Sequence, residues 1–115
     1  MRRLFVLLLF PLAAPAFAGP PSYKLDIRDH GFVPTTLTVP ADVRIKLEVS
    51  NTRSLPSEFE SFDLNREKVV PGGSTVTVWI GPLKPGKYKF FDDFNPASIG
   101  WIIVAAAKPG AEPKR

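Results

Sequence analysis

The sequence contains no cysteine and only one histidine, His30, and its single methionine is Met1. Without cysteine the chain can form neither a disulfide bond nor a cysteine-linked lipid anchor. A nucleophilic serine would have only His30 as its histidine partner, and no glycine-rich phosphate-binding loop opens a helix. These absences argue against the common classes of enzyme.

Long apolar runs are missing after residue 18. No segment there approaches the roughly 18 apolar residues of a membrane-spanning helix. Residues 1–18 instead combine Arg2 and Arg3, an apolar run over 4–10 and a small-residue motif at 16–18, which is the pattern of a cleaved export signal. We expect a soluble periplasmic protein, exported by the general secretory route rather than the twin-arginine route that the paired arginines would also fit.

A strong excess of charge is also absent. The chain has 15 Lys and Arg against 11 Asp and Glu, and two of the arginines fall in the expected signal. The basic residues are scattered, so nucleic acid is not an expected partner. Four carboxylates nevertheless gather within ten positions, at Glu58, Glu60, Asp63 and Glu67. A solvated loop would explain this acidic cluster, and so would a ligand site.

Apolar residues recur at every second position in several short runs, which is the period of half-buried β-strands. These runs lie at residues 23–27, 37–39, 43–49, 76–80 and 88–90, and a continuous apolar run follows at 101–105. Pro and Gly turns separate them, and no long helix is expected. We predict one domain over residues 19–107, an all-β antiparallel Greek-key β-sandwich of about seven strands, with a flexible tail over 108–115.

Three segments together resemble the cupredoxin family. They are E-F-E-S-x-x-L-x-R-E-K-V-V at 58–70, G-P-L-K-P-G-x-Y-x-F-F at 81–91 and G-W-I-I-V at 100–104. The first two are similar to the small periplasmic cupredoxins that accompany bacterial ferrous-iron permease systems. The resemblance implies a cupredoxin-like sandwich that binds iron, copper or both. It also implies a partner, either a membrane iron permease or another periplasmic iron-uptake subunit.

The ligand positions implied by the resemblance differ from those of a blue-copper site. Glu58 stands at the first histidine, Asp92 at the cysteine and Asn95 at the second histidine. A blue-copper centre needs the cysteine thiolate, so a plastocyanin-like electron carrier is excluded. Carboxylate oxygens favour hard cations such as Fe(III) and tolerate Cu(II) when an imidazole assists. Such a site suits an Fe(II) oxidase, with copper as a redox partner, or a protein that delivers Fe(III).

The favoured ligands are Glu58, Glu60, Asp92 and His30. Glu58 and Glu60 are two residues apart on an expected strand, so they project from one face. Alternation sends only one of Asp92 and Asp93 to that face, and Asp92 is the one favoured by position. His30 lies in a turn and is the expected ligand for any Cu(II).

Three further residues are less favoured as ligands. Asp93 can cap a turn, and Asn95 offers at best a weak carbonyl oxygen. Glu67 can pair with a neighbouring Arg or Lys, or complete a second acidic site with Glu60 or Asp63. Two other functions stay open beside iron handling. One is a metal-free scaffold that docks to a permease or a periplasmic subunit, and the other is a periplasmic copper-binding chaperone centred on His30.

Overall fold

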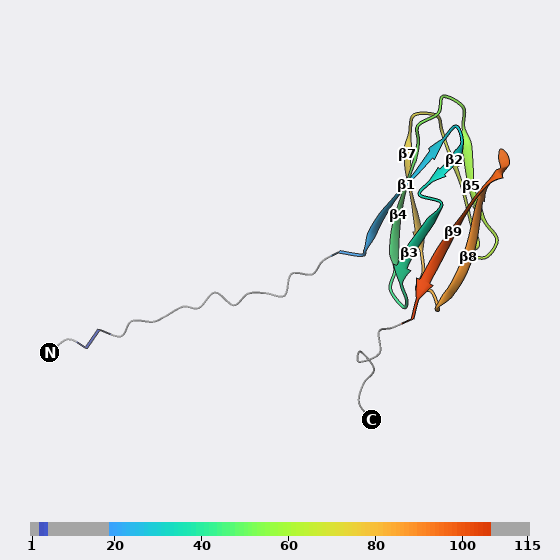
Figure 1. Ribbon diagram of the computed structural model, residues 1–115. Helices are drawn as coiled ribbons and strands as arrows, with labels where there is room; N and C mark the ends of the chain where they lie inside the picture. The colour runs from blue at the N-terminus through green and yellow to red at the C-terminus, as the bar shows by residue number, and fades with distance from the viewer. Residues whose placement is uncertain (1–2, 5–18, 107–115) are drawn as a thin grey trace.

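The computed structural model describes residues 3–4 and 19–106. Most of the expected signal, and the expected tail over 108–115, therefore lie outside the described residues. Within the described part, nine β-strands form two stacked sheets (Figure 1). No helix among these residues is long and apolar enough to cross a membrane.

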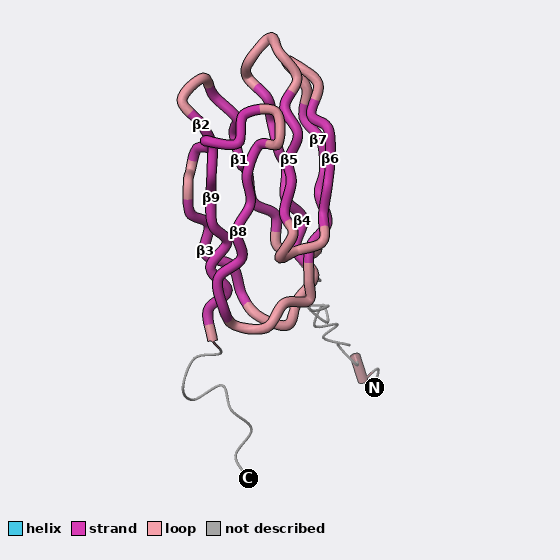
Figure 2. The backbone as a smooth tube through the Cα atoms, turned by 90° about the vertical axis from the view of Figure 1, so that its right-hand side faces the viewer, coloured by secondary structure: helices cyan, strands magenta, loops and turns pink. Residues whose placement is uncertain are grey.

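The first sheet has the strand order β2-β1-β4-β7 and the second has the order β3-β9-β8-β5-β6. The strands of the first sheet are β1 (Ser22–Arg28), β2 (Gly31–Val33), β4 (Ile45–Asn51) and β7 (Thr75–Ile80). Those of the second are β3 (Thr36–Pro40), β5 (Ser57–Ser61), β6 (Arg66–Val70), β8 (Gly86–Asp92) and β9 (Asn95–Ala105). Strands β6 and β7, from different sheets, lie side by side at one edge of the sandwich (Figure 2).

The predicted β-sandwich is confirmed, but its sheets are mixed rather than wholly antiparallel. β1 pairs with β4 in parallel, and β3 pairs with β9 in parallel. Hydrophobic alternation reports which face of a strand is buried, and that face is the same for either strand direction. The alternation of apolar residues therefore carries no information on whether two strands pair in parallel or antiparallel fashion.

The acidic stretch forms a β-hairpin at the edge of the second sheet rather than a solvated loop. β5 and β6 pair in antiparallel fashion, from Ser57 opposite Val70 to Ser61 opposite Arg66. Phe59 is fully buried in the core. Since successive side chains of a strand point to opposite faces, burial of Phe59 turns both neighbouring glutamates toward the outer face.

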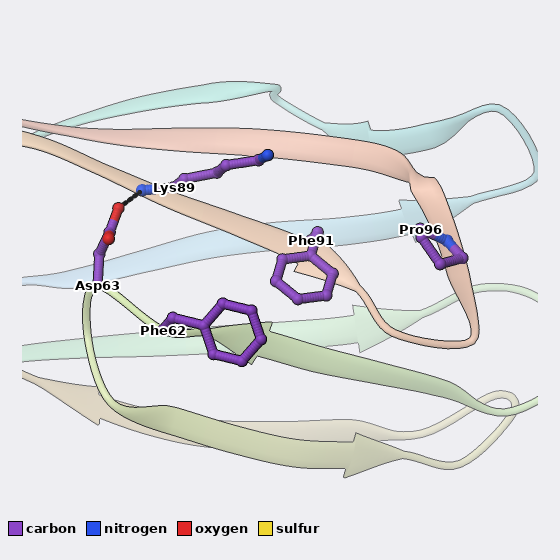
Figure 3. A pocket seen from close by; sticks show the side chains of 5 residues that line it. All are labelled: Phe62, Asp63, Lys89, Phe91 and Pro96. Atoms are coloured by element: carbon purple, nitrogen blue, oxygen red, sulfur yellow. Dashed lines mark hydrogen bonds between the residues drawn. The ribbon is translucent and has the colours of Figure 1, made fainter.

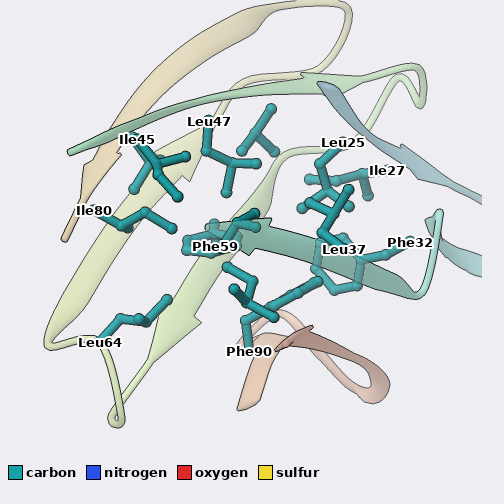
Figure 4. Close-up of a cluster of buried hydrophobic side chains, with 14 of the residues drawn as sticks. Leu25, Ile27, Phe32, Leu37, Ile45, Leu47, Phe59, Leu64, Ile80 and Phe90 are labelled. Carbon is teal, nitrogen blue, oxygen red and sulfur yellow. The ribbon is translucent and has the colours of Figure 1, made fainter. Parts of the chain in front are cut away.

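Three phenylalanines form the centre of the core, where they join the two sheets (Figure 4). The rings of Phe32 and Phe90 lie 4.8 Å apart edge to face, and those of Phe59 and Phe90 lie 5.3 Å apart. Gly100 of β9 lies opposite Phe90, and a Cβ atom there would come within 2.2 Å of the Phe90 ring. This packing fixes β5, β8 and β9 relative to one another, and these strands carry most of the candidate ligands.

Candidate metal centre

Glu58, Glu60 and Glu67 converge on the outer face of the β5–β6 hairpin, and we call them the carboxylate trio. Each offers one carboxylate oxygen, and the three oxygens lie within 4.8 Å of one another. Glu60 lies directly opposite Glu67, and Glu58 is the next residue of β5 on the same face. Directly opposed residues of antiparallel strands have Cβ atoms about 5 Å apart. The hairpin register therefore brings the trio together.

Negative charge is concentrated at the trio, and no cationic side chain of the described residues forms an ion pair there. None of the ion pairs among the described residues involves any of the three glutamates. Glu58 is only 7% exposed, and one oxygen of Glu60, Oε2, is buried without a hydrogen-bond partner. A proton or a cation placed among these oxygens would relieve the repulsion.

The crowding of the carboxylates raises the pKa of Glu58. It is raised from its ordinary value of 4.5 to about 7. The largest cause is the hydrogen bond to the Glu67 side chain, followed by burial, the charge of Glu67, the hydrogen bond to Glu60 and the charge of Asp93. Each of these effects favours the protonated form of a carboxyl group. Glu58 is therefore the member of the trio on which a proton and a metal ion would compete.

Asp92 lies on a different face from the one expected. It pairs with Phe59, so its side chain follows Phe59 inward rather than Glu58 outward. Its carboxylate is buried, and Oδ1 accepts the backbone N–H groups of Glu58 and Phe94, each at 3.0 Å. Asp92 thus fastens the start of β5 to the turn between β8 and β9, and the structure does not bring it into the trio.

Asp93, rather than Asp92, is the aspartate on the side of Glu58. Its backbone N–H donates to the Glu58 carbonyl oxygen at 2.9 Å, and its charge contributes to the raised pKa of Glu58. Asp93 is exposed and lies just after β8. Of the two aspartates, it is therefore the one better placed to approach a cation at the trio.

His30 and Asn95 lie outside the trio. His30 is exposed in the turn between β1 and β2. Asn95 begins β9 and donates from Nδ2 to Ser98 Oγ at 3.1 Å. Ser98 in turn lies beside Gly31, the residue after His30. Ser98 therefore links the turn that contains His30 to the start of β9, and a ligand role for His30 or Asn95 stays a prediction.

Glu67 reaches Glu60 through the hairpin turn, which the alternation of apolar residues along the sequence does not reveal. Ser61 and Asn65 mark this turn. Ser61 Oγ accepts the Leu64 N–H at 3.1 Å, and Asn65 has a positive φ of 52°, which Asn tolerates better than most residues. A tight turn that ends at Asn65 places Glu67 opposite Glu60.

The donor atoms of the trio do not fit a blue-copper centre. That centre needs a thiolate and imidazoles, whereas the trio offers only carboxylate oxygens and the chain has no cysteine. Oxygen donors suit hard cations instead. The trio therefore offers oxygen donors alone and does not fit copper–sulfur electron transfer.

The model of the cupredoxin-like domain family matches residues 2–104, and the chain belongs to this family. A relative is the uncharacterized protein RP394 of Rickettsia prowazekii (strain Madrid E), which is 44% identical over 82 residues. That alignment covers 70% of this chain and 66% of the relative. The chain thus spans just under two thirds of the length of that relative.

Solved structures share the fold at low sequence identity. Auracyanin A, a blue copper protein from Chloroflexus aurantiacus, matches with a TM-score of 0.65 and 15% identity, over 76% of this chain and 100% of that chain. A second match is the metal binding domain of the Cu(I) exporting P-type ATPase CopA from Streptococcus pneumoniae D39. Its TM-score is 0.65 and its identity 9%, over 74% of this chain and 85% of that chain. At these identities the likeness shows the fold alone.

Proposed function

We propose that this cupredoxin-like domain binds iron at Glu58, Glu60 and Glu67 in place of the copper–sulfur site. The observation that carries the proposal is the convergence of three carboxylate oxygens within 4.8 Å, joined to no cationic side chain of the described residues. Anionic oxygen ligands favour hard cations. By charge alone they stabilise Fe(III) more than Fe(II).

The biological role that fits such a site is assistance to iron uptake in the periplasm. Fe(II) bound at the trio would lose one electron to dioxygen, and the carboxylates would stabilise the Fe(III) product. Alternatively, the domain would receive Fe(III) and deliver it to a membrane permease. Support comes from the 58–70 block, which resembles the cupredoxins of ferrous-iron permease systems and contains all three glutamates.

The first test is a binding titration of the purified chain with Fe(III) from a competing chelator, followed by calorimetry. We expect Glu58→Gln, Glu60→Gln and Glu67→Gln each to lower the affinity by at least about tenfold, as expected when a charged ligand is lost. Glu48→Gln is the matched control, because Glu48 lies in the other sheet and pairs with Lys46 at 3.4 Å. Equal affinity in all four variants would contradict a site at the trio.

The second test is aerobic Fe(II) oxidation by the same protein, with and without one equivalent of Cu(II), against a protein-free control at the same pH. Acceleration that the trio variants lose would establish the oxidase. Binding of Fe(III) without acceleration would leave delivery as the role. Accelerated oxidation that survives in all three trio variants would place the redox centre elsewhere.

Copper binding is a second candidate, favoured by the fold. The solved structures that share it include proteins whose names identify copper as their metal, and His30 is the one imidazole of the chain. His30→Ala should then abolish Cu(II) binding and leave Fe(III) binding intact. If neither metal binds, the metal-free scaffold remains, and its contact with a partner protein should be unchanged in chelator.

A further inference from the structure

The outer face of the second sheet changes character along β8. Successive outward positions of this strand carry Lys87, Lys89 and Phe91, and Asp93 follows the end of the strand. The outer face along β8 is therefore basic at the lysine end and acidic at Asp93, and the aromatic ring of Phe91 lies between these ends. Asp63 lies at the basic end, where its Oδ2 accepts the backbone N–H of Lys89 at 2.8 Å (Figure 3). No ion pair joins Asp63 to a lysine among the described residues.

The middle of this face is apolar and open. Phe62 is 78% exposed, and its ring lies 5.4 Å from that of Phe91 (Figure 3). On the neighbouring strand β9, Ile99 lies opposite Phe91 and Trp101 lies opposite Lys89, and they are 39% and 40% exposed. Large apolar side chains grouped on one exposed face mark an interaction surface.

A shallow pocket of about 280 Å³ lies within this surface. It is lined by Phe62, Asp63, Lys89, Phe91 and Pro96 (Figure 3). The pocket gives the apolar centre a concave part into which a side chain from outside can fit. We call the surface made by Phe62, Lys87, Lys89, Phe91, Asp93, Ile99 and Trp101 the β8–β9 face.

We propose that a second copy of this chain covers the β8–β9 face. The face is complementary to itself under a two-fold rotation whose axis lies in the plane of the face, across the strands, between Lys89 and Phe91. Under this rotation, a residue of β8 in one copy faces the β8 residue of the second copy that lies at the same distance from the axis but on its opposite side. Lys87 then meets Asp93 of the second copy, and Lys89 lies over Phe91 of the second copy, beside Glu60.

The neighbouring strand obeys the same rotation. Because Trp101 is opposite Lys89 and Ile99 is opposite Phe91, Trp101 packs on Ile99 of the second copy, and the reverse contact forms as well. A symmetric dimer uses one surface patch on both subunits, so each contact occurs twice. An apolar centre flanked by opposite charges is the usual make-up of a protein interface.

The test is a charge swap, read by sedimentation equilibrium of the purified chain in chelator, so that no metal occupies the carboxylates. We expect the wild type to dimerise with rising concentration. Lys87→Glu and Asp93→Lys should each raise the dimer dissociation constant by at least about tenfold, because each places like charges in contact twice. An equimolar mixture of the two variants should associate again, since both of its contacts pair opposite charges.

Two further variants keep the result interpretable. Trp101→Ser should weaken the dimer without altering charge at its rim. Lys24→Glu, an exposed lysine on β1 of the other sheet, should leave association unchanged, and circular dichroism should show every variant folded. A wild type that stays monomeric at all concentrations would overturn the proposal and assign the face to a different protein. A dimer that forms but shows no restoration in the mixture would overturn it too.

Discussion

Replacement of Asp92 should separate its support of the fold from any role in binding metal. The Asp92 side chain is 1% exposed, and its Oδ1 accepts two backbone N–H groups, those of Glu58 and Phe94. Asp92→Ala removes this acceptor and leaves both N–H groups without it. A buried donor left without a partner costs about 1–3 kcal/mol. The Glu58 bond is buried and the Phe94 bond only partly so, so we expect a total loss of about 2–4 kcal/mol.

A loss of this size is a large share of the 5–15 kcal/mol by which a typical domain is stable. Urea unfolding followed by circular dichroism measures it as a shift of the midpoint at constant slope. Asp92→Asn keeps an oxygen that can accept both N–H groups, so we expect it to recover most of the stability. Because the carboxylate is not needed at the trio, Asp92→Asn should also change Fe(III) affinity by no more than a few-fold.

Two outcomes would refute this reasoning about Asp92. If Asp92→Ala cost less than about 0.5 kcal/mol, within the range of ordinary surface substitutions, the two hydrogen bonds would not hold the start of β5. If Asp92→Asn were stable but lost Fe(III) binding, the carboxylate itself would be a ligand, as the resemblance to cupredoxins implies.

Two other predictions concern the proton at Glu58 and the packing of Gly100. The folded pKa of Glu58 is about 7, against 4.5 ordinarily, so the folded chain keeps a proton that the unfolded chain releases. Its contribution to stability is therefore full below pH 4.5 and is lost as pH rises toward 7. Urea midpoints of the wild type should fall across this window relative to Glu58→Gln, and a matching fall in both proteins would contradict the assignment. Gly100→Ala should cost at least about 1–3 kcal/mol, because its Cβ would lie 2.2 Å from the Phe90 ring, and Phe90→Leu in the same chain should recover part of that loss.

The buried faces of the strands could be predicted from the sequence. The alternation at 23–27 became β1 and that at 76–80 became β7, since a period of two is what a half-buried strand requires. By contrast, the apolar run at 101–105 marks only the end of the last strand. β9 in fact begins at Asn95. The Pro and Ser residues that follow Asn95 resemble a loop in composition. They lie at a register shift, between Asn95, which pairs with Asp92, and Ile99, which pairs with Phe91.

The glutamates of β5 could be predicted as a pair, whereas their third member depended on register. Glu58 and Glu60 are neighbours on one strand, so local geometry places them on one face. Glu67 joins them only because a turn of fixed length sets β6 against β5. The inward direction of Asp92 likewise depends on its pairing with Phe59. Local sequence fixes direction along one strand, and contacts between strands need the register of both.

The carboxylate trio also destabilises the fold, because like charges lie close together there. Like charges directly opposite one another across a β-ladder are destabilising, and Glu60 faces Glu67 in this way. Nearby residues could have relieved the repulsion, since Lys68 is adjacent in β6, yet it pairs with Phe59 on the other face. Arg66 also turns away, donating from Nε to the Trp79 carbonyl oxygen at 2.7 Å. A site whose own cations are directed elsewhere, while one of its carboxyl groups holds a raised pKa, has the features of a binding site. An external cation would enter such a site without first displacing a side-chain cation of the described residues.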